Sequence, residues 1–375
     1  MKRIRFILFS ALAILIGSAT QNPAQESTDL QSQIQKFQAG THQFMLAGYA
    51  VTSFIKEEGN PSQFESAFMP IFLFKATDKV FFEGELEIEI EDGAQEMNLE
   101  YGQILYLFSD YLIFGAGKFL NPTNYFIERL HPAWINKMPD KPLMVHPGTR
   151  MLASQHLGFQ LRGAVPIKGS KIEYSFFVGM GPVLDPATGE VTFTNYGDNN
   201  DNKSIGGRIG FIPIPKFEIG YGFEVAKVGD ANTNLESVKA INNVVDFSYA
   251  KEIKGLKGGV DLKAQLVWLN IDNPNIAPLI YSNDSFGGYA QISFRPYNSP
   301  SEFFQNLEFV YRYDWSDKPN KAPSNEYIKR SGFGINYWLT SSSLFKFAYE
   351  TSNIDLPNGS TTNEHRFIGQ VAFGF

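Results

Sequence analysis

The chain has 375 residues, of which 34 are Phe, 17 are Tyr and 33 are Gly, and it contains no Cys. Without cysteine it can form no disulfide, no zinc–thiolate site and no lipid anchor on an N-terminal Cys, and its formal net charge of −7 lacks the basic footprint of a nucleic-acid-binding protein. An excess of aromatic residues and Gly without Cys is typical of a large all-β protein.

Residues 1–19 predict a cleavable secretory signal peptide. Basic residues precede an apolar run over residues 6–17, which is too short to cross a bilayer as a helix. We expect cleavage after Ala19, with Ala24 as the alternative. Residues 20–40 then form a short periplasmic segment, either a helix or a disordered lead-in. An exported protein without Cys indicates a bacterial envelope.

From residue 41 onward, apolar and polar side chains alternate in segments of about ten residues. The stretch VFFEGELEIEIEDG (residues 80–93) is the clearest, because five glutamates occupy every second position. Successive side chains of a strand point to opposite faces, so this stretch predicts a strand with one carboxylate face and one apolar face. Taken alone, such a strand also fits the solvated face of a soluble sheet.

The same alternation recurs about sixteen times, which predicts an all-β fold: a closed transmembrane antiparallel β-barrel over residues 41–375. Connections after even-numbered strands are mostly tight, and those after odd-numbered strands are longer and rich in Asn, Asp, Pro and Gly. Short turns at one end and long loops at the other are typical of such a barrel, with both termini on the periplasmic side. A ring of this size is too wide for side chains to fill, so the carboxylate face should line a water-filled lumen. The expected strands begin near residues 41, 62, 80, 97, 111, 156, 171, 204, 217, 238, 256, 285, 307, 327, 343 and 365.

The longest connection, residues 121–155, follows the fifth expected strand and is the third external loop. Its five prolines and its apolar anchors, such as Phe126 and Trp134, predict an ordered segment. The last strand ends on an aromatic residue, Phe375, which resembles the C-terminal signal by which outer-membrane barrels are recognised for insertion.

The signal peptide, the sixteen alternating strands, the long third loop and the terminal Phe together resemble the sixteen-stranded bacterial outer-membrane porins. Within them, FGAGKFLNPTNYFIERLHPAWINKMPDKPL (residues 114–143) is similar to the strand and loop that follow Gly-Lys-Phe in phosphate-selective porins and their relatives in Bacteroidetes. The resemblance implies a third loop that folds into the lumen and narrows it, and a folded cap over the mouth is the alternative. Phosphate-selective members carry Arg and Lys ladders, whereas glutamates line one wall here, so the chain departs from them on that feature. The candidate constriction residues are Glu128, Arg129, His131, Trp134, Lys137, Lys141 and Arg150.

Parity along the strands assigns charged side chains to the lumen, with an acidic wall facing a more basic one. Opposite charges across water create a transverse field that orients charged and dipolar solutes, although simple solvation of the wall explains the charges equally well. The candidate pore-lining residues are Glu83, Glu85, Glu87, Glu89, Glu91, Lys118, Arg162, Arg208, Arg295, Arg312, Arg330, Lys346 and Arg366.

Enzymatic chemistry is not expected, because the five histidines show no His-x-x-His spacing and no Ser lies in a Gly-x-Ser-x-Gly turn. The run YGDNNDNKS (residues 196–204) has oxygen ligands of the kind that Ca²⁺ takes, but Asn and Asp are more often turn formers there. No metal site and no cofactor are predicted.

The sequence therefore predicts a passive diffusion porin for small hydrophilic solutes and ions in the outer membrane. The expected partners are membrane lipids and these solutes, with no nucleic acid, and barrels of this size favour a homotrimer. A structural or partner-binding barrel without a freely conducting pore is the alternative.

Overall fold

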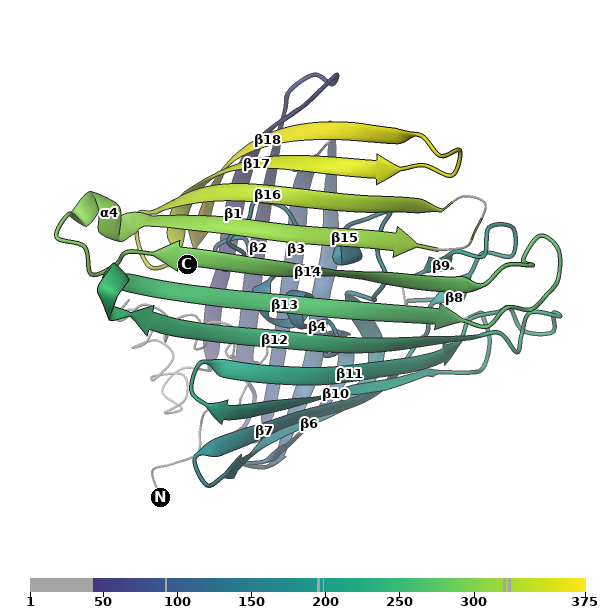
Figure 1. Ribbon diagram of the computed structural model, residues 1–375. Coiled ribbons are helices and arrows are strands. Elements are labelled where there is room, and N and C mark those ends of the chain that lie inside the picture. The colour runs from purple at the N-terminus through teal and green to yellow at the C-terminus, as the bar shows by residue number, and fades with distance from the viewer. Residues whose placement is uncertain (1–42, 92, 194–195, 198, 320–321, 323–324) are drawn as a thin grey trace.

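Sixteen strands close into one antiparallel barrel in this computed structural model, which describes residues 43–91, 93–193, 196–197, 199–319, 322 and 325–375 (Figure 1). Neighbouring barrel strands along the chain are paired, and β1 pairs with β18 to complete the ring. The predicted all-β barrel is confirmed. The predicted signal peptide and the segment over residues 20–40 lie outside the described residues.

The strand boundaries follow the predicted ones closely, and β3, β10, β11, β15 and β17 begin at the predicted residues. The barrel strands are β1 (Phe44–Glu57), β2 (Gln63–Lys75), β3 (Val80–Glu91), β4 (Ala94–Ser109), β5 (Leu112–Leu120), β6 (Gln155–Ile167), β7 (Ser170–Gly179), β10 (Ser204–Ile214), β11 (Phe217–Lys227), β12 (Lys239–Ile253), β13 (Gly258–Ile271), β14 (Asn283–Arg295), β15 (Leu307–Lys318), β16 (Glu326–Trp338), β17 (Ser343–Asp355) and β18 (Thr361–Gly374). A separate hairpin is formed by β8 (Val183–Leu184) and β9 (Val191–Thr192), and the short helices are α3 (Tyr125–Leu130), η1 (Leu143–Val145), η2 (Lys254–Leu256) and α4 (Glu302–Asn306). None of the described helices has the length and apolar character needed to cross a bilayer.

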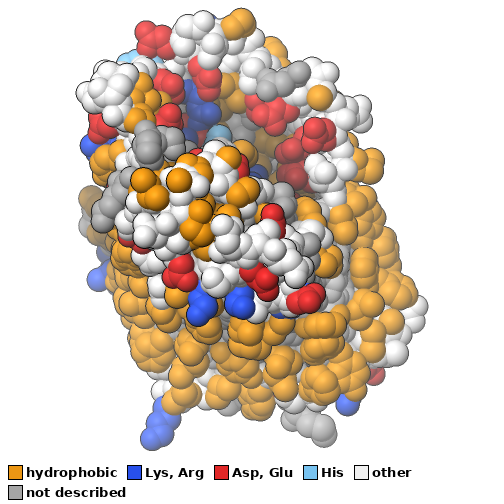
Figure 2. All heavy atoms as spheres, turned by 90° about the vertical axis from the view of Figure 1, so that its right-hand side faces the viewer, with side chains coloured by type: hydrophobic (Ala, Val, Ile, Leu, Met, Phe, Trp, Pro, Cys, Tyr) orange, Lys and Arg blue, Asp and Glu red, His pale blue; other side chains and the backbone are white. Residues whose placement is uncertain are grey.

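The outer face of the barrel is apolar because the outward-facing positions of the strands carry mostly hydrophobic residues. In β11, Ile219, Tyr221 and Phe223 are 45%, 49% and 37% exposed, whereas Glu218 and Glu224 of the opposite parity are buried. Exposed apolar and buried charged side chains invert the arrangement of a soluble protein and fit a strand between lipid and a polar interior. Figure 2 shows a broad belt of hydrophobic side chains beneath the loops.

The connections divide the barrel into two ends. Those after β2, β4, β6 and the other strands that run the same way gather at one end, here called the turn end, and the long connections gather at the loop end (Figure 1). The connection over residues 296–306 carries α4 and is longer than the other turns. The loop end carries the β8–β9 hairpin, which packs in a second hydrophobic cluster with Val228 and Leu279.

The C-terminal residue takes part in closing the ring. The backbone N–H of Gly48 donates to the carbonyl of Phe375 over 3.0 Å, and the N–H of Phe375 donates back over 2.9 Å. The Phe375 ring stacks on Phe68 with centroids 5.9 Å apart. Gly48 has a φ of +150°, and a Cβ there would lie 2.4 Å from the Met69 carbonyl oxygen, so only glycine fits this seam.

Candidate functional site

The glutamates of β3 lie on the lumen side of the barrel. Phe82 and Ile90, which have the opposite parity, are exposed on the outer belt. The β3–β4 pairing shifts register between Glu85 and Leu86, so that β4 has Glu100 as an extra residue at this level. The predicted separation into a carboxylate face and an apolar face is thus present in the fold.

The ladder of glutamates divides into a covered part and an open part. Glu83 accepts a hydrogen bond from Gln103 Nε2 over 2.7 Å, and Glu85 accepts one from the Tyr49 hydroxyl over 3.0 Å; both glutamates are fully buried. The members closer to the loop end are half-buried or exposed. They are Glu87, Glu89 and Glu91.

The connection between β5 and β6, here called the lumen loop (residues 121–154), crosses the interior of the barrel. It begins with α3, whose N-terminus is capped by the Asn124 side chain accepting from the N–H of Ile127. The backbone N–H of Phe126 donates over 3.0 Å to the side-chain oxygen of Gln265 on β13. The loop therefore reaches lumen-facing side chains on the side of the barrel opposite β3.

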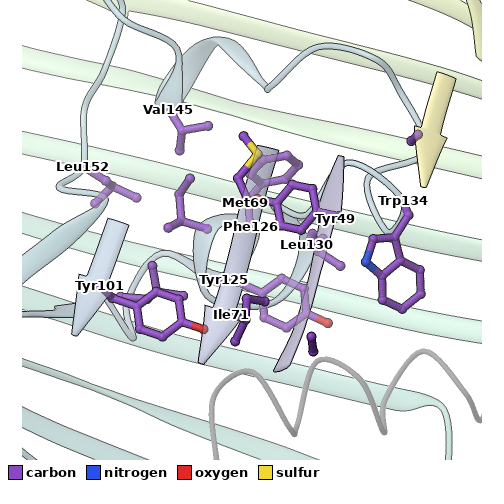
Figure 3. Close-up of a cluster of buried hydrophobic side chains, with 14 of the residues drawn as sticks. Tyr49, Met69, Ile71, Tyr101, Tyr125, Phe126, Leu130, Trp134, Val145 and Leu152 are labelled. Carbon is purple, nitrogen blue, oxygen red and sulfur yellow. The ribbon is translucent and has the colours of Figure 1, made fainter. Parts of the chain in front are cut away.

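One side of the lumen is apolar and packs against the lumen loop, as Figure 3 shows for ten labelled residues. We expected a hydrophilic, water-filled lining, and along β1 to β5 that expectation was wrong, because inward-facing positions there also carry apolar side chains. The wall contributes Met45, Ala47, Tyr49, Met69, Ile71, Leu73, Phe81, Tyr101, Leu105 and Ile113, and the loop contributes Tyr125, Phe126, Ile127, Leu130, Trp134, Met144, Val145, Met151 and Leu152.

Ion pairs also attach α3 to a different part of the barrel wall, formed by β6, β7 and β11. The Arg129 guanidinium donates to Glu218 of β11 over 2.9 Å and also contacts Glu173 of β7. Arg162 of β6 donates to Glu128 of the loop over 2.9 Å. Charge-assisted hydrogen bonds of this kind are about twice as strong as neutral ones, so they hold α3 in place.

A second set of ion pairs, here called the arginine cluster, joins the tip of the loop to β15, β16, β17 and β18. The cluster consists of Arg312, Arg330, Arg366, Asp314 and Glu350 from the strands and Asp140 from the loop. The Asp140 carboxylate contacts both Arg330 and Arg366. Burial alone would raise the pKa of Asp140, but Arg366 and Arg330 outweigh it and hold the pKa well below its usual range.

Lys141, the next residue of the loop, belongs to the acidic side of the lumen. Its side chain is exposed, and the surrounding charges that act on it most are Glu87, Glu100 and Glu89. Desolvation in the lumen lowers the pKa of Lys141, but these three carboxylates outweigh it and raise the pKa above its ordinary value. Asp140 therefore contacts the arginine cluster, whereas the charges that act most on the adjacent Lys141 are acidic. Figure 2 shows the hollow at the loop end with acidic and basic side chains around it.

At the turn end, a cavity of about 100 Å³ lies between the loop and the wall. Lys137 of the loop donates to Glu308 over 2.6 Å and to the Ser293 hydroxyl over 2.7 Å. Trp134 and Arg295 also line this cavity. Lys346, which is fully buried, donates to the Ala133 carbonyl.

The structure brings most of the predicted charged residues to the lumen. Arg208 is buried there and donates to Asp246 over 2.8 Å. Among the predicted constriction residues of the lumen loop, His131 places its Nε2 atom 3.8 Å from Oε1 of Glu85. Arg150 is half-buried near the end of the loop. The lumen-side members of the predicted pore lining are Glu83, Glu85, Glu87, Glu89, Glu91, Arg162, Arg208, Arg295, Arg312, Arg330, Lys346 and Arg366.

The prediction for Lys118 was wrong, because this residue lies on the outer face of the barrel. It pairs in register with Leu157, which is exposed on the outer belt, while the adjacent Phe119 is fully buried. Its ammonium lies 4.3 Å from the centroid of the Tyr196 ring and donates to the Leu99 carbonyl.

Asn side chains in the 196–204 run form hydrogen bonds to the connection between β11 and β12. Asn199 donates to the Val228 carbonyl over 2.8 Å, and Asn200 donates to the Gly229 carbonyl over 2.9 Å. Over the part of the chain that the structure describes, no group of three His, Asp or Glu side chains is arranged to hold a metal ion.

Comparison with solved structures identifies the architecture. An anion-selective porin from Comamonas acidovorans matches with a TM-score of 0.57 at 10% identity, covering 88% of this chain and 99% of that one. The outer-membrane channel DcaP of Acinetobacter baumannii matches with a TM-score of 0.55 at 9% identity, covering 88% and 97%. The chain has the fold of an outer-membrane porin.

The fold also matches OmpT, an outer membrane protein of Vibrio cholerae described in a trimer form, with a TM-score of 0.52 at 10% identity. This match covers 88% of this chain and 99% of the OmpT chain. No protein-family model matches the chain, and no curated protein matches it in sequence. The comparisons therefore establish the fold alone.

Proposed function

We propose that the protein is an outer-membrane channel through which small hydrophilic solutes and ions diffuse passively past the lumen loop. The observation that carries this proposal is the set of charged side chains inside a closed barrel, which comprises the open glutamates of β3 and the arginine cluster with Asp140 of the lumen loop. A closed ring with an apolar outer belt fits a bilayer, and charged groups inside it fit the passage of polar solutes.

The orientation follows from the two ends. Short turns on the periplasmic side and long loops outside are the usual arrangement of such barrels, so the turn end is assigned to the periplasm. Export through the predicted signal peptide over residues 1–19 belongs to the same proposal. The function includes no catalytic step and no cofactor.

The lumen charges favour cations over anions at the loop end. Arg312, Arg330 and Arg366 are each paired with carboxylates, whereas Glu87 and Glu89 lie near the loop end with Lys141 as a nearby positive charge. A preference for phosphate, as the similarity to phosphate-selective porins of Bacteroidetes would imply, is therefore not part of the proposal.

The second candidate function is a structural or partner-binding barrel that does not conduct freely. The apolar packing of the lumen loop against β1 to β5 favours it, since such packing excludes water from part of the lumen.

Liposome swelling separates the two functions. Liposomes that contain the purified barrel should swell in small neutral sugars and more slowly as sugar size increases. A partner-binding barrel leaves the liposomes as tight as those without protein, and that result would contradict the channel.

Assembly as a homotrimer is a further part of the proposal. Ala290 of β14 is exposed on the outer face, where small residues allow barrels to approach closely. Mass measurement in mild detergent should give three chains per particle. A mass of one chain under conditions that preserve the fold would remove the trimer.

A further inference from the structure

Two lysines lie side by side on the outer face of the barrel at its loop end. Lys227 ends β11, Lys239 begins β12, and the two residues are directly opposite in the antiparallel register. The next outward pair, Val225 and Ile241, belongs to the apolar belt, and each side chain is 37% exposed. The lysines therefore mark the level where the belt gives way to the loops, and Figure 2 shows basic side chains at such a border.

Like charges in this arrangement are unfavourable unless an anion lies between them. Directly opposed residues on antiparallel strands have Cβ atoms about 4.5–5.5 Å apart, and like charges there destabilise the sheet. Among the described residues, neither ammonium group forms an ion pair. Asp272, which follows β13, accepts a hydrogen bond from the backbone N–H of Lys239 over 3.2 Å. The two side-chain ammonium groups are thus available to a common acceptor.

A third lysine extends the pair. Lys203 directly precedes β10, where Ile205 pairs with Val225. Lys203 comes two residues before Ile205 and Lys227 two residues after Val225, so both flank the same end of the β10–β11 pair. Three basic residues from three adjacent chain segments then lie at one level of the outer face.

From this placement we propose that Lys227 and Lys239 bind the phosphate of a lipid headgroup. Phosphate oxygens accept charge-assisted hydrogen bonds from both ammonium groups, and Val225 and Ile241 contact the upper part of the acyl chains. The inference rests on the proposed membrane location, since only there do a phosphate layer and an apolar layer meet the barrel at these two adjacent levels.

Native mass spectrometry of the mature chain in a neutral detergent tests this site. The protein is titrated with phosphatidic acid, whose headgroup is a phosphate monoester, and with phosphatidylcholine for comparison. We expect the wild type to retain phosphatidic acid in preference to phosphatidylcholine. Lys227→Gln with Lys239→Gln should weaken this binding about thirtyfold, because each basic residue near an anionic lipid surface contributes roughly fivefold in affinity.

The matched control, Lys79→Gln with Lys254→Gln, removes the same charge from exposed turns at the opposite end and should bind like wild type. Equal binding by wild type and the Lys227/Lys239 variant would overturn the site, and so would equal loss in the control. Displacement of the lipid by millimolar inorganic phosphate would also overturn it, because the site would then accept free phosphate. If the double variant does not fold, each single Gln variant should still lose about fivefold. Conductance is measured separately, so a barrel that binds this lipid but does not conduct contradicts the proposed channel alone.

Discussion

Neutralising two of the three open glutamates should shift the ion preference of the channel toward anions. The variant is Glu87→Gln with Glu89→Gln, which keeps the size and polarity of both side chains. Glu83 and Glu85 are left intact, because both side chains are buried and accept hydrogen bonds from other side chains. Removing their charges would test the stability of the fold rather than conduction.

The size of the effect follows from Coulomb's law. In water, one carboxylate acts on an ion about 8 Å away with roughly 0.5 kcal/mol, and 0.1 M salt with a screening length of about 10 Å reduces this to roughly half. In recordings at about pH 9.5, two ionised carboxylates favour a cation and disfavour an anion by about 0.5 kcal/mol each way, so losing both should lower the cation-to-anion permeability ratio about fivefold. At 1 M salt the screening length is about 3 Å and the effect should nearly vanish.

Reversal potentials in planar bilayers under a salt gradient measure this ratio. The control, Glu236→Gln with Glu302→Gln, removes two exposed carboxylates from a loop and from α4 and should leave the ratio unchanged. If the Glu87/Glu89 variant has the wild-type ratio at low salt, these glutamates do not face the conduction path and the assignment of the acidic wall is refuted.

Three other substitutions test separate parts of the fold. Ile88→Glu places a charge on the lipid side of β3 and should destabilise the inserted barrel by up to about 2 kcal/mol in urea unfolding, while Ile88→Val should not; normal insertion and stability of the Glu variant would refute the outward assignment. Deleting residues 123–147 should raise single-channel conductance severalfold, because the lumen loop occupies the interior; a folded barrel of unchanged conductance would make the loop a cap. Asp140→Asn removes the carboxylate that Arg330 and Arg366 share and should lower the free energy of unfolding by about 3 kcal/mol, whereas Asp185→Asn at an exposed loop should have little effect. Equal stability of these two variants would show that the arginine cluster does not anchor the loop.

The strands could be predicted from the sequence because lipid and lumen impose opposite demands on alternate residues. A strand such as β11 carries glutamates at every inward position that is not glycine or alanine, so its parity can be read directly. β5 has no such contrast, since Gly115, Ala116 and Gly117 place small residues on both faces. The face of Lys118 could not be assigned from that pattern.

The packing of the lumen loop was missed, although one signal was present. Residues 68–74 (FMPIFLF) form an unbroken apolar run, which is typical of a strand covered on both faces. That run shows that something apolar lies inside the barrel against β2. It does not show which residues do so.

The ion pairs of the lumen loop lie beyond sequence reasoning for a different reason. Asp140 meets Arg366, which is 226 positions further along the chain. Such a contact depends on the path of the loop across the lumen, and that path is set by many weak contacts with several strands. Charge type and parity indicate which residues face inward but not which of them pair.

Single-channel recording of the wild-type protein in planar bilayers tests the central claim most directly. We predict discrete, stable conductance steps that are small for a barrel of this width, because the lumen loop narrows the interior, with a cation preference at low salt. Inserted, folded protein that gives no conductance steps would contradict a channel and would favour the partner-binding barrel.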